Sequence, residues 1–473
     1  MPHKGDADKD FDVIIVGCGP AGLFAAYYLG ENTGLKVLVV EKGKSSRKRL
    51  CPINGEQECM RCRPCNIMSG VGGAGLFSDG KLNYIHKLGK TDLTQFMPVA
   101  DAKKLIRDTE EIYNLFNMDG QVYPTSMEKA RNIRKDALKN GVDLLLIRQK
   151  HLGSDKLPGH ISNMAEYVKS RGVEIHTSEE VRDVLVENGQ VQGVVTSRRE
   201  YKASSVILAP GRVGAEWVSN LARRHGLNVS QRGIEVGVRV EVNRDVMQDL
   251  CDVIYDPTFF IRTNTYDDQV RTFCTNHGGF VALENYQDFV CVNGHAYMDK
   301  KSDNTNFAFL SKVVLEDPVT SNQAYGESIG RLATIIGGGR PVLQRYGDLK
   351  RGRRSTWNRI SNSFVEPTMK NVTCGDIAMA LPERIVRNIV EGLEKLNRVV
   401  PGVSNEGTLL YAPEIKFFAT QVHTSNVLET CIQGLFVAGD GPGVAGNIVS
   451  ASATGLIPAR EIARRHETRA DGS

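Results

Sequence analysis

Short apolar runs that lead directly into glycine-rich turns are the main pattern at the start of the chain. Residues 11–16 (Phe-Asp-Val-Ile-Ile-Val) have the composition of a strand buried on both faces. The turn 17–22 (Gly-Cys-Gly-Pro-Ala-Gly) follows at once, residues 23–29 predict a helix, and 36–40 predict a second strand that ends at Glu41. This order of strand, glycine turn, helix and strand predicts a βαβ unit.

The glycines of this turn and the acidic residue after it have separate roles in dinucleotide binding. Gly17 permits the tight turn, Gly19 lets a pyrophosphate approach the backbone, and Gly22 lets the helix pack against the strand. The N-terminus of the helix presents free N–H groups and a positive dipole end to the phosphates. Glu41, roughly twenty residues after the turn, can accept hydrogen bonds from a ribose diol. We therefore predict a dinucleotide-binding site here.

Two further turns repeat the same glycine spacing. Residues 70–75 (Gly-Val-Gly-Gly-Ala-Gly) follow 66–69, a segment too short and polar for a buried strand. Residues 441–446 (Gly-Pro-Gly-Val-Ala-Gly) follow the apolar run 435–438, but no acid-terminated strand comes after them. Neither turn therefore predicts a second dinucleotide, and we expect both to close around the far end of the first one.

Periodicity predicts the remaining elements. Short alternating runs within 233–300 indicate a largely antiparallel sheet. Strands are expected at 173–176, 181–187, 191–196 and 205–208, and helices at 101–117, 125–141, 320–336 and 376–398.

The composition is that of a globular protein. Of the 473 residues, 41% are hydrophobic and 24% are charged, which argues against disorder and against a membrane bundle. A net charge of +4 predicts no general affinity for nucleic acid or for an anionic membrane. We find no secretory leader and no membrane span, because the apolar run 13–30 contains four glycines and a proline. Ten cysteines without a signal peptide indicate reduced thiols, a metal site or redox chemistry, and we expect a cytoplasmic location.

Basic residues gather in two short segments, 42–49 and 350–354. A solvated face is the favoured interpretation of each. Both segments are also compatible with docking of an acidic carrier protein or a phosphorylated substrate.

Three separated motifs resemble the FAD fingerprints of glutathione-reductase-type flavoproteins. They are residues 17–22 with Glu41, residues 209–211 (Ala-Pro-Gly), and residues 434–440 (Gly-Leu-Phe-Val-Ala-Gly-Asp), and they span nearly the whole chain in the family's order. One departure is that Ala-Pro stands where the family usually has threonine. The resemblance implies that Asp440 contacts the ribityl-phosphate region of FAD.

The block 72–82 (Gly-Gly-Ala-Gly-Leu-Phe-Ser-Asp-Gly-Lys-Leu) adds a narrower resemblance. Together with residues 52–55 and 271–274, it is similar to a poorly characterised group of bacterial and plastid FAD-dependent dehydrogenases. By the flavoprotein resemblance, the helix after 446 points its N-terminus at the flavin pyrimidine ring, and Val181 offers backbone atoms to the adenine. The motifs and the resemblance together assign FAD contacts to Gly17, Gly19, Pro20, Ala21, Gly22, Glu41, Lys42, Gly72, Gly73, Ala74, Ser78, Asp79, Gly80, Lys81, Val181, Ala209, Gly211, Gly439, Asp440, Gly446, Asn447 and Ile448.

Four of the ten cysteines lie within fifteen residues, at Cys51, Cys59, Cys62 and Cys65. Their number and type fit tetrahedral Zn²⁺ or an iron–sulfur cluster. They also fit redox-active or disulfide-forming thiols, because the C-x-x-C arrangement lowers a thiol pKa. In flavin disulfide reductases, the redox cysteines likewise fall between the ribose-binding acid and the flavin-facing loop. A structural loop without chemistry is the third interpretation, and the sequence leaves all three open.

Four other side chains are candidates for catalysis. His277 and His295 lie beside glycines in the expected substrate domain, where an imidazole can take a proton while hydride leaves for the flavin. Lys416 is a candidate for binding a carboxylate or polarising a carbonyl, and Lys81 for stabilising negative charge on the reduced ring. A lone histidine more often has a structural role than a catalytic one, so a structural role is the alternative for His277 and His295.

The sequence therefore predicts an α/β protein with a discontinuous Rossmann-type FAD-binding domain (1–85, 150–232 and 405–473). A helical insertion is expected at 86–149 and a substrate domain with a mainly antiparallel sheet at 233–404. Disulfide reductases carry a second glycine fingerprint for NAD(P)H, and residues 212–404 contain none. We expect an oxidoreductase that moves hydride between a small organic substrate and FAD. The alternatives are a reductase fed by ferredoxin or thiols, an FAD monooxygenase, and a non-catalytic FAD-binding protein.

Overall fold

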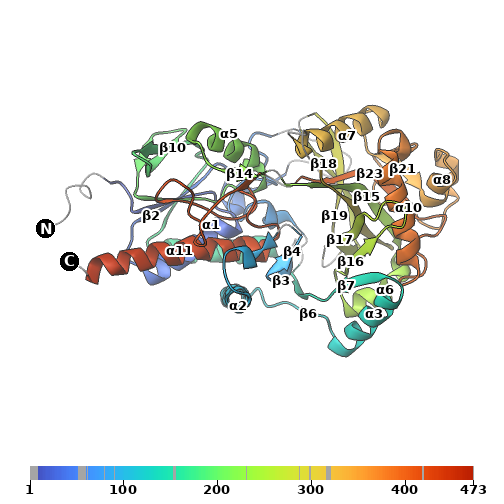
Figure 1. Ribbon diagram of the computed structural model, residues 1–473, viewed down its shortest axis with the longest axis horizontal. Coiled ribbons are helices and arrows are strands. Elements are labelled where there is room, and N and C mark those ends of the chain that lie inside the picture. Colours follow the sequence, from blue (N-terminus) through green and yellow to red (C-terminus); the bar gives the residue numbers. More distant parts are fainter. Residues whose placement is uncertain are drawn as a thin grey trace. The chain divides into compact units, whose positions relative to one another are not determined.

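The computed structural model describes residues 9–51, 60, 62–78, 80–89, 91–152, 156–230, 232–286, 288–297, 300–315, 321–417 and 420–471. The chain forms two compact units, each made of separated segments (Figure 1). Unit 1 consists of Met1–Gly120, Leu152–Gln231 and Ala419–Ser473, and unit 2 of Gln121–His151 and Arg232–Phe418.

A parallel sheet forms the centre of unit 1. Its strand order is β25-β13-β1-β2-β9, and every neighbouring pair is parallel. The central strand β1 is buried on both faces, as its unbroken apolar sequence predicts. The strands are β1 (Val13–Val16), β2 (Val37–Glu41), β9 (Glu174–Thr177), β13 (Ser205–Leu208) and β25 (Leu435–Val437).

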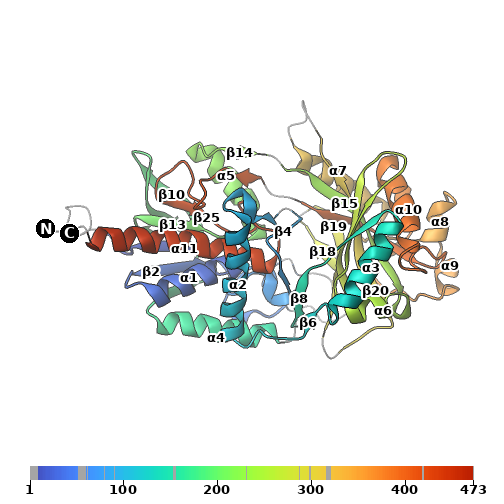
Figure 2. The ribbon, with the colours of Figure 1, turned by 60° about the horizontal axis from the view of Figure 1, so that its bottom comes forward.

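Helices α1 (Pro20–Asn32) and α11 (Ile448–Asp471) pack against each other beside this sheet (Figure 2). They approach closely because Gly455 of α11 has no side chain, since a Cβ there would lie 2.1 Å from the carbonyl oxygen of Ala21. The other helices of unit 1 are α2 (Val99–Leu115), α4 (Leu157–Ser170) and α5 (Ala215–His225). Its smaller strands are β3 (Lys81–Tyr84), β4 (Lys87–Leu88), β5 (Thr91–Asp92), β10 (Val181–Glu187), β11 (Gln190–Thr196), β12 (Glu200–Lys202), β14 (Val229–Ser230) and β24 (Gln421–Val422).

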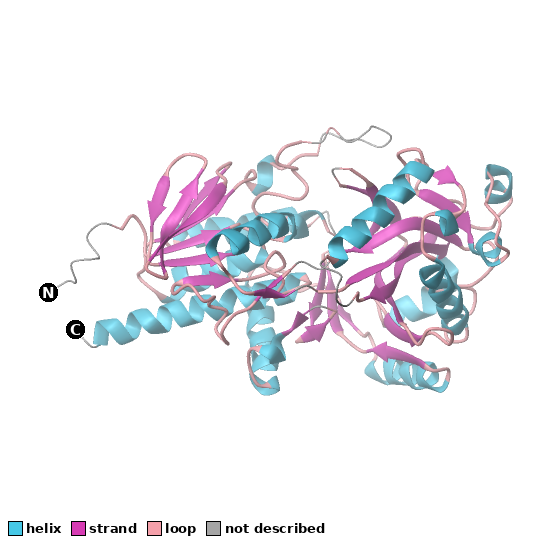
Figure 3. Cartoon of the chain, turned by 45° about the horizontal axis from the view of Figure 1, so that its top comes forward, coloured by secondary structure: helices cyan, strands magenta, loops and turns pink. Residues whose placement is uncertain are grey.

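Unit 2 is built on an eight-stranded sheet with the order β22-β21-β23-β15-β20-β17-β16-β7 (Figure 3). All of its pairs are antiparallel except β21 with β22. The strands are β7 (Val142–Leu145), β15 (Ile234–Asn243), β16 (Thr258–Arg262), β17 (Gln269–His277), β20 (Asn304–Val313), β21 (Val342–Arg345), β22 (Thr373–Cys374) and β23 (Leu409–Lys416). The parallel sheet and this separate antiparallel one confirm the predicted α/β fold class.

The central strand β15 has one apolar and one polar face, and both are buried. Ile234, Val236, Val238, Val240 and Val242 belong to the core that includes the apolar side of helix α10 (Glu383–Asn397). The opposite face carries Glu235, Arg239 and Glu241, and a hairpin of β18 (Phe280–Asn285) and β19 (Val290–His295) packs over it. The remaining elements of unit 2 are β6 (Val122–Tyr123), β8 (Arg148–His151), α3 (Met127–Lys139), α6 (Gln248–Val253), α7 (Asn322–Ile336), α8 (Tyr346–Lys350) and α9 (Trp357–Ser361).

Local capping explains where the helices differ from their predicted bounds. Helix α3 begins after Ser126, whose hydroxyl accepts the N–H of Lys129 at 3.3 Å, and α7 begins after Ser321 in the same way. The predicted helix 376–398 is two elements, a 3₁₀ turn at Ile377–Met379 and α10, because Pro382 occupies the N-cap of α10. Among the described residues, none of the helices combines the length and the apolar composition needed to cross a membrane.

Candidate functional site

The turn between β1 and α1 has no room for side chains at two of its glycines. Gly17 has φ +98°, and a Cβ there would lie 2.3 Å from the carbonyl oxygen of Ala209. At Gly22, a Cβ would lie 1.9 Å from the oxygen of Gly17. The backbone of α1 can therefore approach β1 only with glycine at these positions.

Four of the predicted FAD segments follow strands of the parallel sheet, so they lie at its carboxyl edge. The N–H of Ala209, after β13, donates to the oxygen of Val16 at 2.8 Å, and the N–H of Ala438, after β25, donates to Leu208 at 2.9 Å. Glu41 ends β2, and the turn 17–22 follows β1. Ligands of open α/β sheets bind outside this edge.

Glu41 holds three backbone N–H groups. Its Oε2 accepts from Cys18 at 2.8 Å, and its Oε1 accepts from Gly43 at 2.8 Å and Gly70 at 2.9 Å. A carboxylate has about four lone-pair sites, so roughly one is left for a ribose hydroxyl. In this structure, Glu41 joins the first glycine turn to the loop 70–75.

Arg49 is buried, although the basic segment 42–49 is predicted to form a solvated face. That interpretation is wrong for Arg49, which is 2% exposed. Its guanidinium donates to five carbonyl oxygens within residues 66–73. They belong to Asn66 (2.9 Å), Ile67 (2.5 Å), Gly70 (3.4 Å), Val71 (2.8 Å) and Gly73 (2.8 Å). Burial lowers the pKa of Arg49 to about 10, which still leaves it charged at neutral pH.

The loop 70–75 lies against the first glycine turn. The N–H of Gly72 donates to the oxygen of Cys18 at 2.7 Å, and a Cβ on Gly19 would be 3.6 Å from the Cα of Gly73. Beyond the loop, the hydroxyl of Ser78 donates to Gly75 at 2.7 Å. Asp79 lies outside the described residues, as do residues 52–55. Lys81, on β3, is 7% exposed.

The last glycine turn leads into α11. Asn447 caps this helix, because its Oδ1 accepts the N–H of Ser450 at 2.9 Å. The Nδ2 of Asn447 is buried and has no hydrogen-bond partner among the described residues. Asp440 pairs with Arg212 at 3.4 Å. An unsatisfied amide at a helix N-terminus is suited to a carbonyl group of a ligand.

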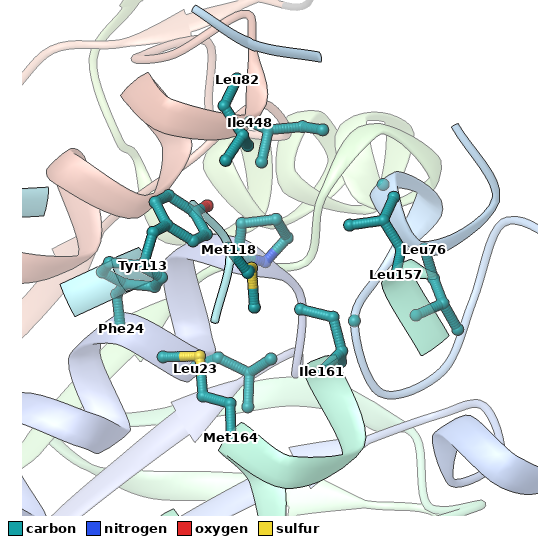
Figure 4. Close-up of a pocket in the computed structure, with 13 residues that line it drawn as sticks. Leu23, Phe24, Leu76, Leu82, Tyr113, Met118, Leu157, Ile161, Met164 and Ile448 are labelled. Atoms are coloured by element: carbon teal, nitrogen blue, oxygen red, sulfur yellow. The ribbon is translucent and has the colours of Figure 1, made fainter. Parts of the chain in front are cut away.

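A small apolar cavity joins three of these segments (Figure 4). Pro20 at the start of α1, Gly72 and Gly75 of the loop, and Ile448 at the start of α11 all line it. Its volume of about 20 Å³ is far too small for a flavin ring. What the cavity shows is that the three segments meet. The rest of its lining is Leu23, Phe24, Leu76, Leu82, Tyr113, Met118, Leu157, Ile161 and Met164.

The cysteine cluster is only partly described. Cys51 and Cys62 are half-buried and Cys65 is exposed, all as free thiols, and Cys59 lies outside the described residues. Across the part of the chain that the structure describes, no group of three or more His, Cys, Asp and Glu side chains is placed to hold a metal ion. The carbonyl oxygen of Cys65 accepts the N–H of Ser69, which links the cluster to the segment that Arg49 holds.

In unit 2, the polar face of the sheet contains a fully buried ion pair. Arg239 and Glu414 are both 0% exposed, and Arg239 Nη1 lies 3.2 Å from Glu414 Oε1. Arg239 also donates to Asn306 Oδ1 at 2.8 Å and to the oxygen of Cys274 at 2.7 Å. Gly294 of β19 covers this cluster, and a Cβ there would lie 2.1 Å from Arg239 Nη2. The hairpin can therefore cover the ion pair only with glycine at this position.

The predicted catalytic residues of unit 2 lie at different places around this face. Lys416 Nζ is 3.0 Å from Glu414 Oε1, so it belongs to the cluster. His277 is held by Thr305 (2.9 Å) and Gln248 (3.0 Å), and burial lowers its pKa. His295 packs in an aromatic group with Phe280 and Tyr297.

The basic segment 350–354 is largely paired within the chain. Lys350 lies 2.7 Å from Glu394, Arg353 lies 2.7 Å from Asp348, and Arg351 pairs with Glu406. These pairs reduce the positive charge available to an acidic partner.

Two family models match parts of the chain. Residues 234–416 match "FAD-dependent protein, C-terminal domain-like", from the start of β15 to the end of β23, and residues 6–46 match the Thi4 family, through β1, α1 and β2. A protein of Clostridium beijerinckii described as an uncharacterized protein is 24% identical over 481 residues, which cover 96% of this chain and 81% of the relative.

Solved structures of an oxidase and a dehydrogenase are also similar. Glycine oxidase from Geobacillus kaustophilus has 13% identity and a TM-score of 0.39, with 96% of this chain and 95% of that one covered. L-proline dehydrogenase from P. horikoshii has 12% identity and a TM-score of 0.39, with 97% and 94% covered. Similarity with identities and TM-scores this low adds nothing to the description of the fold given by the two sheets.

The family matches support FAD as the cofactor and an FAD-dependent oxidoreductase as the class of protein. The residues of this site fit FAD in two respects. Gly17 and Gly22 let the N-terminus of α1 pack directly against β1 and the residues after β13, because a Cβ at either would collide with backbone, and Asn447 presents an unsatisfied amide at the start of α11.

Sequence reasoning missed the buried charges. Arg49 and Arg239 were not candidates, and neither was Glu414. The sequence does carry a signal for the second cluster, because Glu235, Arg239 and Glu241 alternate with valines along one strand. That pattern is typical of a strand with one solvated face, so it does not reveal the covering hairpin.

Proposed function

We propose that the protein is an FAD-dependent dehydrogenase or reductase that moves hydride between a C–C or C–N bond of a small organic substrate and the flavin. The observation that carries this proposal is the convergence of the turn 17–22, the loop 70–75 and the segment 439–448 around the carboxyl edge of one parallel sheet. The narrower resemblance to bacterial and plastid FAD-dependent dehydrogenases is part of the same proposal.

Each segment has its own role in holding the cofactor. The turn 17–22 and the N-terminus of α1 bind the pyrophosphate, and Glu41 accepts a ribose hydroxyl at its remaining lone-pair site. Asp440 contacts the ribityl-phosphate region, and Asn447 bonds the pyrimidine edge. Val181 offers backbone atoms to the adenine. Bound FAD supplies a hydride acceptor, so the protein's own task is to orient the substrate and exclude water.

The proton that accompanies hydride transfer needs an acceptor. When a substrate C–H bond breaks with its electron pair going to the flavin, a proton must leave the neighbouring atom to a base: from N–H when a C–N bond is oxidised, or from the adjacent C–H when a C–C bond is oxidised. His277 and His295 are the candidates for that base in unit 2. Lys81 is the candidate for stabilising negative charge on the reduced ring, and Lys416 for binding the substrate.

Electrons enter from the substrate itself in this proposal, because residues 212–404 contain no second glycine fingerprint for NAD(P)H. The test is anaerobic bleaching of the yellow protein by a panel of small metabolites, with NADPH and NADH run separately. We expect bleaching by a metabolite without a nicotinamide cofactor. Reduction by NADPH alone would contradict the proposal and favour a monooxygenase.

A second candidate is a reductase fed by ferredoxin or thiols through the cysteine cluster. The observation that favours it is the contact of Arg49 with the oxygens of Asn66 and Gly73, which ties the segment just after Cys65 to the loop on the glycine turn. Cys62→Ser should then abolish reduction by reduced ferredoxin or dithiothreitol and leave reduction by dithionite intact. Cys431→Ser, which changes an exposed thiol elsewhere, is the matched control.

A further inference from the structure

Three charged side chains on the polar face of the eight-stranded sheet alternate in sign. Arg239 and Glu414 are 0% exposed, whereas the side chain of Lys416 is 12% exposed. Arg239 Nη1 donates to both oxygens of Glu414, at 3.2 and 3.3 Å, and Lys416 Nζ lies 3.0 Å from Glu414 Oε1. Two cations therefore share one carboxylate, and the outermost of the three groups is an ammonium.

Phe273 lies beside that ammonium. Lys416 Nζ is 5.9 Å from the centroid of the Phe273 ring, and the side chain of Phe273 is half-buried. The guanidinium of Arg271 lies over the same ring at 4.6 Å, but its charge is compensated by Glu235 through bonds of 2.7 and 2.6 Å. Among the described residues, the ion-pair partner of Lys416 is Glu414, which Lys416 shares with Arg239.

The amides beside Arg239 and the backbone that follows Phe273 have features that folding stability does not explain. Asn276 Oδ1 and Asn306 Nδ2 are fully buried without a hydrogen-bond partner among the described residues, which is unfavourable for folding. Cys274 has φ +51°, a conformation unfavourable for a non-glycine residue. The register between β17 and β20 shifts between Phe273 and Asn276. Unpaired amides, strain and a bulge are commonly found together at ligand sites.

We propose that Lys416 and Phe273 form a binding site for a small organic carboxylate. The carboxylate continues the alternation of charge by accepting from Lys416, and the apolar part of the molecule lies against the ring of Phe273. Arg239 and Glu414 are positioning residues, which fix the ammonium and do not touch the ligand. A singly charged carboxylate matches the single excess positive charge of the three groups better than a phosphate dianion does. This inference rests on the proposed function only in taking the substrate as a small organic molecule.

The experiment is a binding measurement on the FAD-loaded protein without turnover. Isothermal titration at fixed ionic strength compares benzoate with benzamide, acetate and inorganic phosphate. The variants are Lys416→Met, Lys416→Arg and Phe273→Leu. Lys312→Met is the matched control, because Lys312 is an exposed lysine of the same sheet. Thermal unfolding of each variant shows whether it is folded.

We expect benzoate to bind at least tenfold more tightly than benzamide and phosphate. Lys416→Met should weaken benzoate at least tenfold, while Lys416→Arg and Lys312→Met retain most of the affinity. Phe273→Leu should weaken benzoate more than acetate. Equal affinity for benzoate and benzamide, preference for phosphate, or unchanged binding in Lys416→Met would each overturn the site. Benzoate binding with no metabolite bleaching the flavin would leave the site standing and contradict only the proposed function.

Discussion

Glu41 and Arg49 hold the backbone of Gly70 from its two sides. Glu41 Oε1 accepts the N–H of Gly70 at 2.9 Å, and Arg49 Nη1 donates to its carbonyl oxygen at 3.4 Å. An acid and a base, both almost fully buried, thus fix one glycine between them. Because the same carboxylate also accepts from Cys18, the pair sets the distance between the loop 70–75 and the first glycine turn. The shape of the expected cofactor cradle therefore depends on a residue outside every glycine motif.

Replacing Arg49 should weaken FAD binding, because its guanidinium holds the backbone of the glycine turn 70–75. Arg49→Met removes the donors to five carbonyl oxygens, and Arg49→Lys keeps the charge but loses the planar fork that reaches them together. We expect at least a tenfold rise in the FAD dissociation constant for both variants, measured by flavin fluorescence. Arg47→Met, at an exposed position of the same basic segment, should bind FAD normally. If Arg49→Met binds FAD with wild-type affinity, the loop 70–75 does not need the guanidinium of Arg49 to hold the cofactor.

A methyl group at Gly22 should disrupt the turn before α1. The Cβ of Gly22→Ala would lie 1.9 Å from the oxygen of Gly17, which is backbone and cannot move aside cheaply. We expect the purified variant to contain little flavin and to unfold at a lower temperature. Gly34→Ala is the control, because nothing lies within 4 Å of a Cβ there. The flavin content and melting temperature of the two variants should differ clearly. Equal values would contradict the close packing of Gly22 against the backbone of Gly17.

Local patterns predicted much of unit 1. The strand 11–16, the turn 17–22 and the strand ending at Glu41 are consecutive in sequence, so periodicity and glycine spacing specify them directly. The fold class was predictable for the same reason, because consecutive residues determine each strand and helix. The roles of the individual site residues in binding and catalysis, like the division into functional domains, stay predictions.

Burial of charge was not predictable, because it depends on segments far apart in the chain. Arg49 resembles its exposed neighbour Arg47 in sequence, and only the loop 66–73 closing over it makes it a core residue. Arg239 is paired with Glu414, 175 positions later, under the hairpin that contains Gly294. Nothing in the spacing of these residues shows which charged position a distant segment will cover.

Breaking the buried ion pair of unit 2 should cost much stability. Arg239→Met leaves the carboxylate of Glu414 fully buried with Lys416 as its remaining cation, and losing one member of such a pair typically costs about 3–5 kcal/mol. The double variant Arg239→Met with Glu414→Leu removes both buried charges, so we expect it to be more stable than Arg239→Met alone. Urea unfolding at neutral pH measures both. If the double variant loses as much free energy of unfolding, relative to wild type, as the two single variants lose together, the two charges act independently.

Acid should destabilise unit 2 through His277. Burial lowers the pKa of this imidazole below its ordinary value of 6.5, and its two ring nitrogens are held by Thr305 and Gln248. Because the folded state takes up the proton less readily than the unfolded chain, this contribution to stability is present above pH 6.5 and is lost as the pH falls through the folded pKa. We expect the free energy of unfolding to fall between pH 7.5 and pH 5, and His277→Gln to reduce that fall. His466→Gln, which changes an imidazole on the last helix of unit 1, is the control variant. If His277→Gln keeps the full wild-type dependence, other groups determine the acid sensitivity, and the neutral ring at this position has no measurable role in it.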